Sequence, residues 1–375
     1  MRVAPRLLTP PGADLALWRG ERANRIGASE IACVLGISPY RSPLSLYYQK
    51  LDGWSDEDSA VMRRGRLMEA VVAVEWSLLH PEFVVRPAGL YQHPEHHWMV
   101  ATPDRLLYTN TGIHDDVVDA EVVCCDLHVV GDAPWLADWA PCCETFTICR
   151  RCCEDCPTCP HLTPEPQPAE LWEGKTAASH EGWGEENTDE VPLHYLIQVR
   201  QQLLVTGLPR ARIAVMMLPS WELREYLVER DPADDALIVA EGENFMRRLA
   251  ELDPPPLDWS PSTTDALKRL HPTVDAVDVD IPADLAEPYE QACADLVAAK
   301  KRRGLYGNQI RAVLGSGRRA MCGGRRIVTR SVYEQTRIDT KALRANEPGI
   351  AKEYSKKSVV DKLIPARIPV GEDDD

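Results

Sequence analysis

The sequence predicts a mixed α/β fold of the α+β kind, with a central mixed sheet flanked by helices. Short apolar runs suited to strands, such as residues 98–101 and 213–218, alternate with segments of helical periodicity, such as residues 60–79. The chain of 375 residues is longer than one compact core usually requires. We therefore expect a core formed by residues 1–109 and 169–253, with further units beside it.

The first half of this core is predicted to contain two helices and four short strands. Ser29 is a suitable N-cap for a helix that ends near Gly36. A second helix spans about residues 60–79. Its apolar residues recur at helical spacing: Leu67, Val71, Val74 and Leu78. The four strands, at residues 83–85, 89–91, 98–101 and 106–108, are expected to form an antiparallel meander.

The second half of the core begins with strand-like residues 170–175. Pro192 then starts an amphipathic helix, and Gly207 ends it. A pair of strands at residues 213–218 and 224–228 and a helix at residues 233–252 complete the core.

Three segments are predicted after the core. Residues 254–281 are rich in proline and are expected to form a linker. Residues 282–370 form a C-terminal extension, with a long helix at residues 285–314 and a hairpin at residues 320–328. Residues 371–375 are an acidic tail that we expect to be disordered.

Charge is distributed unevenly along the chain. The net charge of −16 excludes a uniformly basic nucleic-acid coat protein. Residues 110–190 contain eighteen acidic and three basic residues, whereas residues 300–345 contain thirteen Lys or Arg and two acidic residues. No apolar run is long enough to span a bilayer, and the N-terminus lacks a secretory signal, so we expect a cytoplasmic protein without a membrane partner.

Three carboxylates and a lysine are the strongest candidates for chemistry. Glu173 and Lys175 lie two apart in a predicted strand and share one face, with the Gly174 carbonyl between them as a further oxygen donor. Asp104 ends a neighbouring strand, and Glu69 lies on the preceding helix. Such oxygen donors suit Mg²⁺ or Mn²⁺, and a metal with a nearby lysine can cleave a phosphodiester. The alternative is a solvated strand face.

Six short motifs occur in an order typical of one family. They are Trp-Arg-Gly-Glu-Arg at 18–22, Ile-Gly-Ala-Ser-Glu-Ile at 26–31, Gly65 before Glu69, Thr-Pro-Asp at 102–104, Glu-Gly-Lys at 173–175, and Tyr195 before Gln198. Together they resemble the YqaJ-type viral recombinases, which are lambda-exonuclease-like PD-(D/E)xK nucleases with a restriction-endonuclease-like core. The resemblance covers about residues 18–207, and residues 285–368 resemble the C-terminal extension of many such proteins.

The resemblance implies a DNA exonuclease that degrades duplex DNA from 5′-phosphorylated ends in the 5′ to 3′ direction. It implies two Mg²⁺ or Mn²⁺ ions per site and two-metal hydrolysis. By position, Glu69, Asp104 and Glu173 would be metal ligands, Lys175 the catalytic lysine, and Gln198 a residue near the metal and the attacking water. The expected setting is phage recombination in the bacterial cytosol, with a single-strand annealing protein as partner and a homotrimer as the oligomer to test.

Two residues match the family's seat for the 5′-terminal phosphate, Arg22 and Ser29. An arginine fork beside a hydroxyl at a helix N-terminus suits a phosphate. The alternatives are a surface ion pair of Arg22 with Glu21 or Glu30, and a simple N-cap role for Ser29. Tyr195, Gln198 and Gln202 share one face of the helix after Pro192, a face that borders the active site in this family or is simply solvated.

Residues 110–168 depart from the family, whose members usually join the two strands by a short hairpin. Nine of the twelve cysteines lie there. Clustered Cys-x-x-Cys pairs in a cytosolic protein favour a zinc-ribbon-like site with one Zn²⁺, and an iron–sulfur cluster is the rival. The candidate ligands are Cys149, Cys152, Cys156 and Cys159, with Cys142, Cys143, Cys125, His128 and His161 as alternates.

Arg302 and Arg303 lie in the basic segment and are candidates for contacts with DNA phosphates, the alternative being a solvated helix face. Two other functions compete with a recombination exonuclease. One is a catalytically idle protein that binds DNA ends or a partner on a nuclease scaffold. The other is an endonuclease or a nuclease of the CRISPR-adaptation type.

Overall fold

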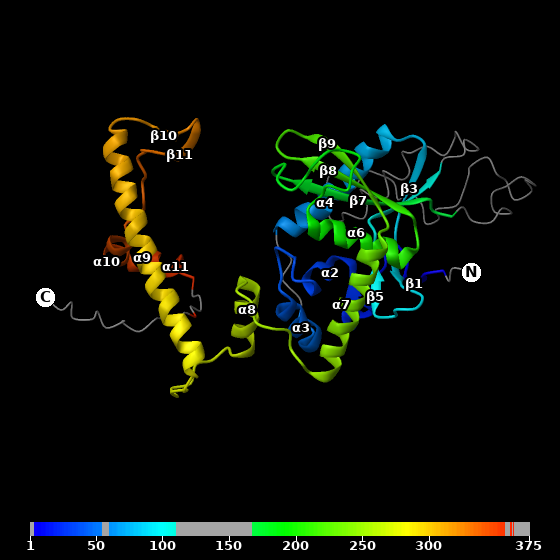
Figure 1. Ribbon diagram of the computed structural model, residues 1–375, viewed down its shortest axis with the longest axis horizontal. Coiled ribbons are helices and arrows are strands. Elements are labelled where there is room, and N and C mark those ends of the chain that lie inside the picture. Colours follow the sequence, from blue (N-terminus) through cyan, green and yellow to red (C-terminus); the bar gives the residue numbers. More distant parts are fainter. Residues whose placement is uncertain (1–3, 55–59, 110–166, 357–360, 362, 364–375) are drawn as a thin grey trace, which may run out of the picture. The chain divides into compact units, whose positions relative to one another are not determined.

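The computed structural model describes residues 4–54, 60–109, 167–356, 361 and 363. The chain divides into two units, Met1–Leu270 and His271–Asp375 (Figure 1). The candidate zinc ligands all belong to residues 110–166, which lie outside the described residues, as does the acidic tail. Within the described residues, no helix combines the length and apolarity needed to cross a membrane.

The first unit contains a five-stranded mixed sheet, and Figure 1 labels its strands β3, β7, β8 and β9. Its order is β3 (Phe83–Pro87), β6 (Arg105–Thr109), β7 (Glu170–Ala177), β8 (Arg210–Met217) and β9 (Glu222–Glu229). β7 and β8 are parallel, and the other neighbours are antiparallel. The predicted mixed α/β fold with a mixed sheet is therefore confirmed.

A second sheet of four strands lies beside the first in the fold, in the order β1 (Arg6–Thr9), β4 (Leu90–Gln92), β5 (Met99–Ala101) and β2 (Ile26–Gly27). The predicted antiparallel meander is wrong, because β3 pairs with β6 while β4 and β5 pair in this second sheet. Pro87 and Pro103, which have no N–H to donate to a ladder, flank the points where the chain changes sheet.

Helices cover both faces of the five-stranded sheet. On one face, α4 (Ala60–Leu79) buries Trp76 against Trp172 of β7 and Met216 of β8. On the other face, α6 (Leu193–Thr206) buries Val199 and Leu203. The buried residues of β7 alternate accordingly, since successive side chains of a strand point to opposite faces.

The buried face of α4 differs from the predicted one. Leu67, Val71 and Leu78 are exposed by 40%, 41% and 71%, whereas the buried residues are Ala70, Val72, Ala73 and Trp76. Small alanines let the helix approach the sheet closely, and the large indole fills the remaining space. The helix bounds themselves match the prediction.

The other helices among the described residues of this unit are α1 (Leu15–Ala23), α2 (Ala28–Val34), α3 (Pro43–Asp52), α7 (Pro232–Glu251) and α8 (Pro261–Leu270). Residues of α2, α6 and α7 share one apolar core. α8 lies within the predicted linker, residues 254–281: Thr263 is buried, and its hydroxyl donates to the Ser42 Oγ at 2.7 Å before α3. Pro261 is the first residue of this helix, a position where the missing N–H of proline costs no hydrogen bond.

The second unit contains the long helix α9 (Ala283–Leu314), the hairpin β10 (Arg319–Cys322) and β11 (Arg325–Thr329), and two short helices, α10 (Thr340–Asn346) and α11 (Pro348–Glu353). Gly323 and Gly324 form the hairpin turn with φ values of 53° and 77°, which glycine adopts without strain. Arg302 and Arg303 are exposed on α9.

Candidate active site

Glu173 and Lys175 lie on the α6 side of β7. The Lys175 ammonium donates to the Glu173 carboxylate at 2.5 Å, and the two side chains are 15% and 3% exposed. Leu171, two residues before Glu173, also faces the apolar core beneath α6. The expectation that the Glu-x-Lys pair shares a face is therefore confirmed, with Glu173 buried and Lys175 partly buried rather than fully solvated.

α6 supplies two amides to the same carboxylate. Gln198 donates to Glu173 Oε1, and Gln202 donates to Glu173 Oε2 at 2.8 Å. These glutamines are four residues apart, so they lie one helical turn apart on the same face. Glu173 thus accepts hydrogen bonds on both oxygens, and Gln202, whose role the sequence left open, contacts it directly.

Asp104 lies immediately before β6, next to the middle of β7. Its carboxylate accepts the Gly174 N–H at 2.9 Å. Burial, together with Glu173 and Glu69 nearby, raises the pKa of Asp104 well above its ordinary value. The causes of this raised pKa show that the three predicted carboxylates lie near one another in one poorly solvated region. They repel one another when ionised.

Glu69 approaches the cluster from α4, on the opposite face of the sheet from α6. Its carboxylate accepts the Arg105 guanidinium at 2.8 Å. A side chain at Gly174 would collide with the Trp172 ring and meet the Glu69 side chain, so glycine leaves room for both beside β7. Burial raises the pKa of Glu69 despite Arg105, and Glu173 adds to the rise.

Arg105 is a site residue that the sequence analysis missed. It is 7% exposed and also donates to the Asp104 carbonyl at 2.7 Å. The only local signal is a basic residue directly after the motif aspartate. Its charge offsets part of the repulsion among the carboxylates and fixes the direction of the Glu69 side chain.

Lys175 is held as a cation. Burial alone would lower its pKa, but the Glu173 and Asp104 carboxylates outweigh burial and raise it. Its ammonium also lies 5.0 Å from the centroid of the Tyr195 ring. A lysine with a raised pKa suits charge stabilisation and water orientation better than proton abstraction.

The carboxylates are oriented by protein donors in this structure. Among the described residues, no three His, Cys, Asp or Glu side chains are arranged as a ready-made metal site. The chemistry of the donor set nevertheless fits a hard divalent cation, because three carboxylates lie close together and the pKa values of Glu69 and Asp104 are raised by burial and by their negative neighbours. The position of the Gly174 carbonyl relative to such an ion remains a prediction.

Arg22 and Ser29 form a second cluster at the start of α2. The Arg22 guanidinium donates to the Ser29 Oγ at 3.3 Å and lies 3.4 Å from Glu30. It also lies 4.3 Å from the Trp18 ring, whose N–H donates to the Thr102 Oγ1 at 3.2 Å. Trp18 therefore links this cluster to the Thr-Pro-Asp motif that carries Asp104.

The N-cap of α2 is Gly27, not Ser29 as predicted. The Gly27 N–H donates to the Glu30 carboxylate at 2.7 Å, which caps the helix from its first turn. A side chain at Gly27 would overlap the Arg22 guanidinium. Ser29 is consequently free of the capping role and presents its hydroxyl to Arg22.

Glu30 and Lys50 hold Arg22 in place. Lys50 lies 3.0 Å from Glu30 and donates to the Arg22 carbonyl at 3.1 Å. Although burial would raise the pKa of Glu30, Arg22 and Lys50 lower it. The alternative ion pair of Arg22 with Glu30 is thus present, while Glu21 pairs with Arg25 at 2.7 Å. Lys50 has no sequence motif that would have identified it.

The family model of the YqaJ-like viral recombinase domain matches residues 17–209, just over half of the chain. The chain belongs to this family. The sequence is also 22% identical over 352 residues to "Uncharacterized protein YqaJ" of Bacillus subtilis (strain 168), which covers 91% of each chain. The predicted resemblance is confirmed.

Two solved structures similar to this YqaJ-family chain are of proteins named as exonucleases. The alkaline exonuclease LHK-Exo from Laribacter hongkongensis is 19% identical, with a TM-score of 0.40, and covers 68% of this chain and 97% of that chain. A phage-related exonuclease from Haemophilus somnus 129PT is 9% identical, with a TM-score of 0.34, and covers 61% and 96%.

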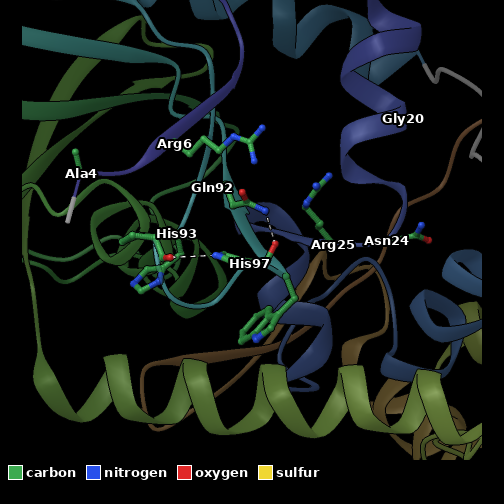
Figure 2. A pocket seen from close by; sticks show the side chains of 10 residues that line it. Ala4, Arg6, Gly20, Asn24, Arg25, Gln92, His93 and His97 are labelled. Carbon is green, nitrogen blue, oxygen red and sulfur yellow. Dashed lines mark hydrogen bonds between the residues drawn. The ribbon is translucent and has the colours of Figure 1, made fainter.

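A pocket of about 620 Å³ lies away from the carboxylates of this YqaJ-family domain. Figure 2 shows Arg6, Gln92 and Arg25 around it, with the Gln92 amide donating to the His97 carbonyl at 2.7 Å. Trp98, which also lines it, precedes β5, whereas Asp104 lies beyond the other end of that strand. The pocket is therefore separate from the candidate site.

We expect Asp104→Asn to stabilise the metal-free protein. Because the folded-state pKa of Asp104 is raised, its ionisation destabilises the fold from about pH 4, its unfolded pKa, up to the folded pKa, and the full penalty persists above that pH. The amide keeps an oxygen for the Gly174 N–H. In EDTA, Tm should rise by a few degrees at pH 8.

The matched control is Asp52→Asn, the same change at an exposed position. Thermal unfolding followed by circular dichroism should show no gain for this control and a gain for Asp104→Asn that shrinks as the pH falls towards 4. A lower Tm for Asp104→Asn at pH 8 would contradict the charge repulsion inferred at the site.

Proposed function

We propose that this protein is an Mg²⁺-dependent DNA exonuclease that degrades duplex DNA from 5′-phosphorylated ends, in the 5′ to 3′ direction, during phage-type recombination. One observation carries the proposal: Glu173 is held between Lys175 and two α6 glutamines, beside Asp104 and Glu69. Membership of the viral recombinase family supports the same conclusion. Intact carboxylates and lysine argue against an idle scaffold.

Glu69, Asp104 and Glu173 would hold two Mg²⁺ or Mn²⁺ ions, with the Gly174 carbonyl as a further donor. When bound, the ions would supply a nucleophilic hydroxide and neutralise charge on the phosphate. The chain's own contribution is preorganisation. Arg105 directs Glu69 through the 2.8 Å contact, and Asp104 is fixed by the Gly174 N–H.

Lys175, Gln198 and Gln202 would orient the reacting groups. The raised pKa of Lys175 keeps it cationic, so it would stabilise negative charge developing on the phosphate and position the water. Gln198 and Gln202 fix both oxygens of Glu173, which limits its rotation. Buried donors of this kind need little reorganisation during the reaction.

Arg22 and Ser29 would bind the 5′-terminal phosphate. The guanidinium is restrained by Glu30 on one side and the Trp18 ring on the other, and its contact with the Ser29 hydroxyl puts two donors side by side. A terminal phosphate carries more negative charge than an internal one. This binding site would therefore favour DNA ends over closed circular DNA. The proposed setting is the bacterial cytosol, with a single-strand annealing partner and a homotrimeric assembly.

Lys175→Ala should lower digestion of a linear 5′-phosphorylated duplex in Mg²⁺ at least a hundredfold, because a buried charge-stabilising donor is lost. Wild-type protein should digest that duplex and leave closed circular DNA intact, as measured by release of labelled nucleotides. Lys268→Ala, at a partly exposed lysine of α8, is the control and should digest normally. Cutting of the circle would indicate an endonuclease, and absence of any cutting would leave the idle-scaffold function.

We propose that the basic segment 300–345 adds contacts to DNA phosphates. Arg302 and Arg303 are exposed on α9, where long side chains can reach a duplex without reading its sequence. Reversing both to Glu should weaken duplex binding in Ca²⁺ and reduce the slope of log K against log salt by up to about two. Fluorescence anisotropy measures both, with Arg247→Glu as the control. Unchanged binding would remove this segment from the DNA path.

We propose that residues 110–168 bind one Zn²⁺ through Cys149, Cys152, Cys156 and Cys159. Elemental analysis should find about one zinc per chain, and Cys149→Ser with Cys152→Ser should lose it. Cys322→Ser, at an exposed cysteine of the hairpin, is the control and should retain zinc. Brown protein with visible absorbance and no zinc would instead indicate an iron–sulfur cluster.

A further inference from the structure

Tyr40 is a large aromatic residue left exposed close to the candidate active site. It lies between α2 and α3, and 74% of its surface is accessible. The loop around it is nonetheless held: the Ser38 hydroxyl accepts the N–H groups of Tyr40 and Arg41 at 3.2 and 3.3 Å. A restrained loop that presents an aromatic ring to solvent has a geometry suited to binding.

A series of rings connects Tyr40 to the catalytic lysine. The Tyr40 ring meets the His194 ring edge-on, with centroids 5.6 Å apart and an interplanar angle of 85°. His194 packs against Tyr195 at 4.0 Å, and the Tyr195 ring lies 5.0 Å from the Lys175 ammonium. Edge-on packing supports the Tyr40 ring while leaving much of its surface open.

The members of this aromatic surface, Tyr40, His194 and Tyr195, carry little charge. Burial and the nearby Lys175 lower the pKa of His194, so its ring is neutral at physiological pH. Burial and the adjacent Tyr40 hydroxyl raise the pKa of Tyr195 to about 12. Neutral rings do not attract phosphates, but they offer a π-face or an apolar edge to a planar ligand.

We propose that Tyr40, supported by His194, stacks against a nucleobase of the DNA strand being cut, within about three nucleotides of the scissile phosphate. This subsite rests on the proposed nuclease function. Every base has a π-face, so the contact would hold the strand in register without selecting its sequence. It would complement the phosphate contacts of Arg22 and Lys175, which fix the backbone but not the base.

The geometry favours a base over a partner protein as the occupant. The exposed ring is reached from Lys175 through two consecutive residues of α6, the helix whose next turn contacts Glu173. A strand whose phosphate lies at Lys175 therefore has its neighbouring bases within reach of this surface. A partner protein on Tyr40 would compete with the substrate for the same space.

A double-mutant cycle between the ring and the base tests this proposal. The substrates are 5′-phosphorylated duplexes with an intact base or an abasic nucleotide at the first, second or third position of the cut strand. Wild-type kcat/KM should fall roughly five- to hundredfold at one abasic position. On intact DNA, Tyr40→Ala should reduce kcat/KM by the same factor relative to wild type. For this variant, removal of the base at that position should reduce kcat/KM little further. Tyr40→Phe, which keeps the ring, should behave as wild type.

Binding is followed independently of cutting by placing 2-aminopurine at the same positions and replacing Mg²⁺ by Ca²⁺. Stacking should quench its fluorescence with wild type and Tyr40→Phe but not with Tyr40→Ala, whose Tm is checked to exclude unfolding. Trp259→Ala, at a residue 93% exposed, is the control and should quench normally.

Fully multiplicative effects of the two changes in the cycle, or equal quenching by Tyr40→Ala, would overturn the stacking contact. A partner-protein role for Tyr40 would give that same pair of results. If wild type cuts the duplex while the cycle shows no coupling, only the stacking inference fails. If wild type cuts no substrate and the quenching is absent, both the nuclease function and the stacking subsite are wrong. If wild type quenches the fluorescence but cuts nothing, the stacking subsite is retained on a protein that only binds DNA.

Discussion

Three carboxylates gathered in a poorly solvated space are the constraint on which this structure depends. Ionised carboxylates repel one another and lose hydration there, and the raised pKa values of Asp104 and Glu69 express that cost. The surrounding donors offset it in part. Lys175 and Arg105 bring positive charge, and the Gly174 N–H donates to Asp104. The site is therefore a locally unstable arrangement held by the stability of the sheets and helices around it.

α6 connects that polar site to the apolar core. One side of the helix buries Val199 and Leu203 against the five-stranded sheet, and Ile197 joins the core shared with α2 and α7. Gln198 and Gln202 lie next to Val199 and Leu203 on the helix and contact Glu173 of the same sheet. Since the same helix is fixed on its apolar sides, its glutamines have little freedom to move away from the carboxylate. Packing thus determines the positions of the donors.

Sequence patterns among neighbouring residues correctly predicted the features that depend on neighbouring residues alone. Alternation along a strand put Glu173 and Lys175 on one face, and Gly207, with a φ of 72°, ended α6 where the sequence predicted. The buried side of α4 was not predictable in this way. Two apolar stripes run along that helix, and the sheet selects the one with small alanines and Trp76.

The assignment of strands to the two sheets and the supporting ion pairs could not be predicted from neighbouring residues, for a related reason. Which strands pair depends on contacts between distant segments, so β3 and β6 could enclose the β4–β5 pair without a distinct sequence signal. Arg105 meets Glu69 across 36 positions, and Lys50 meets Glu30 across 20. The motifs identified the carboxylates and the lysine that meet in the candidate site, while the supporting residues Arg105 and Lys50 were recognised only from the structure.

The strand pairing shows where the cysteine-rich residues 110–168 connect to the described sheet. β6 and β7 are antiparallel neighbours, with Leu107 opposite Glu170 and a hydrogen bond from the Ala169 N–H to the Leu107 carbonyl at 2.7 Å. Asp104 and Glu173 lie on the side of this ladder away from the connection. The cost of closing a loop grows only slowly with its length, so a long connection can replace a short one without changing the register. The acidic insertion can therefore dominate the net charge of the chain while the carboxylates, the lysine and their donors keep the geometry that the paired strands impose.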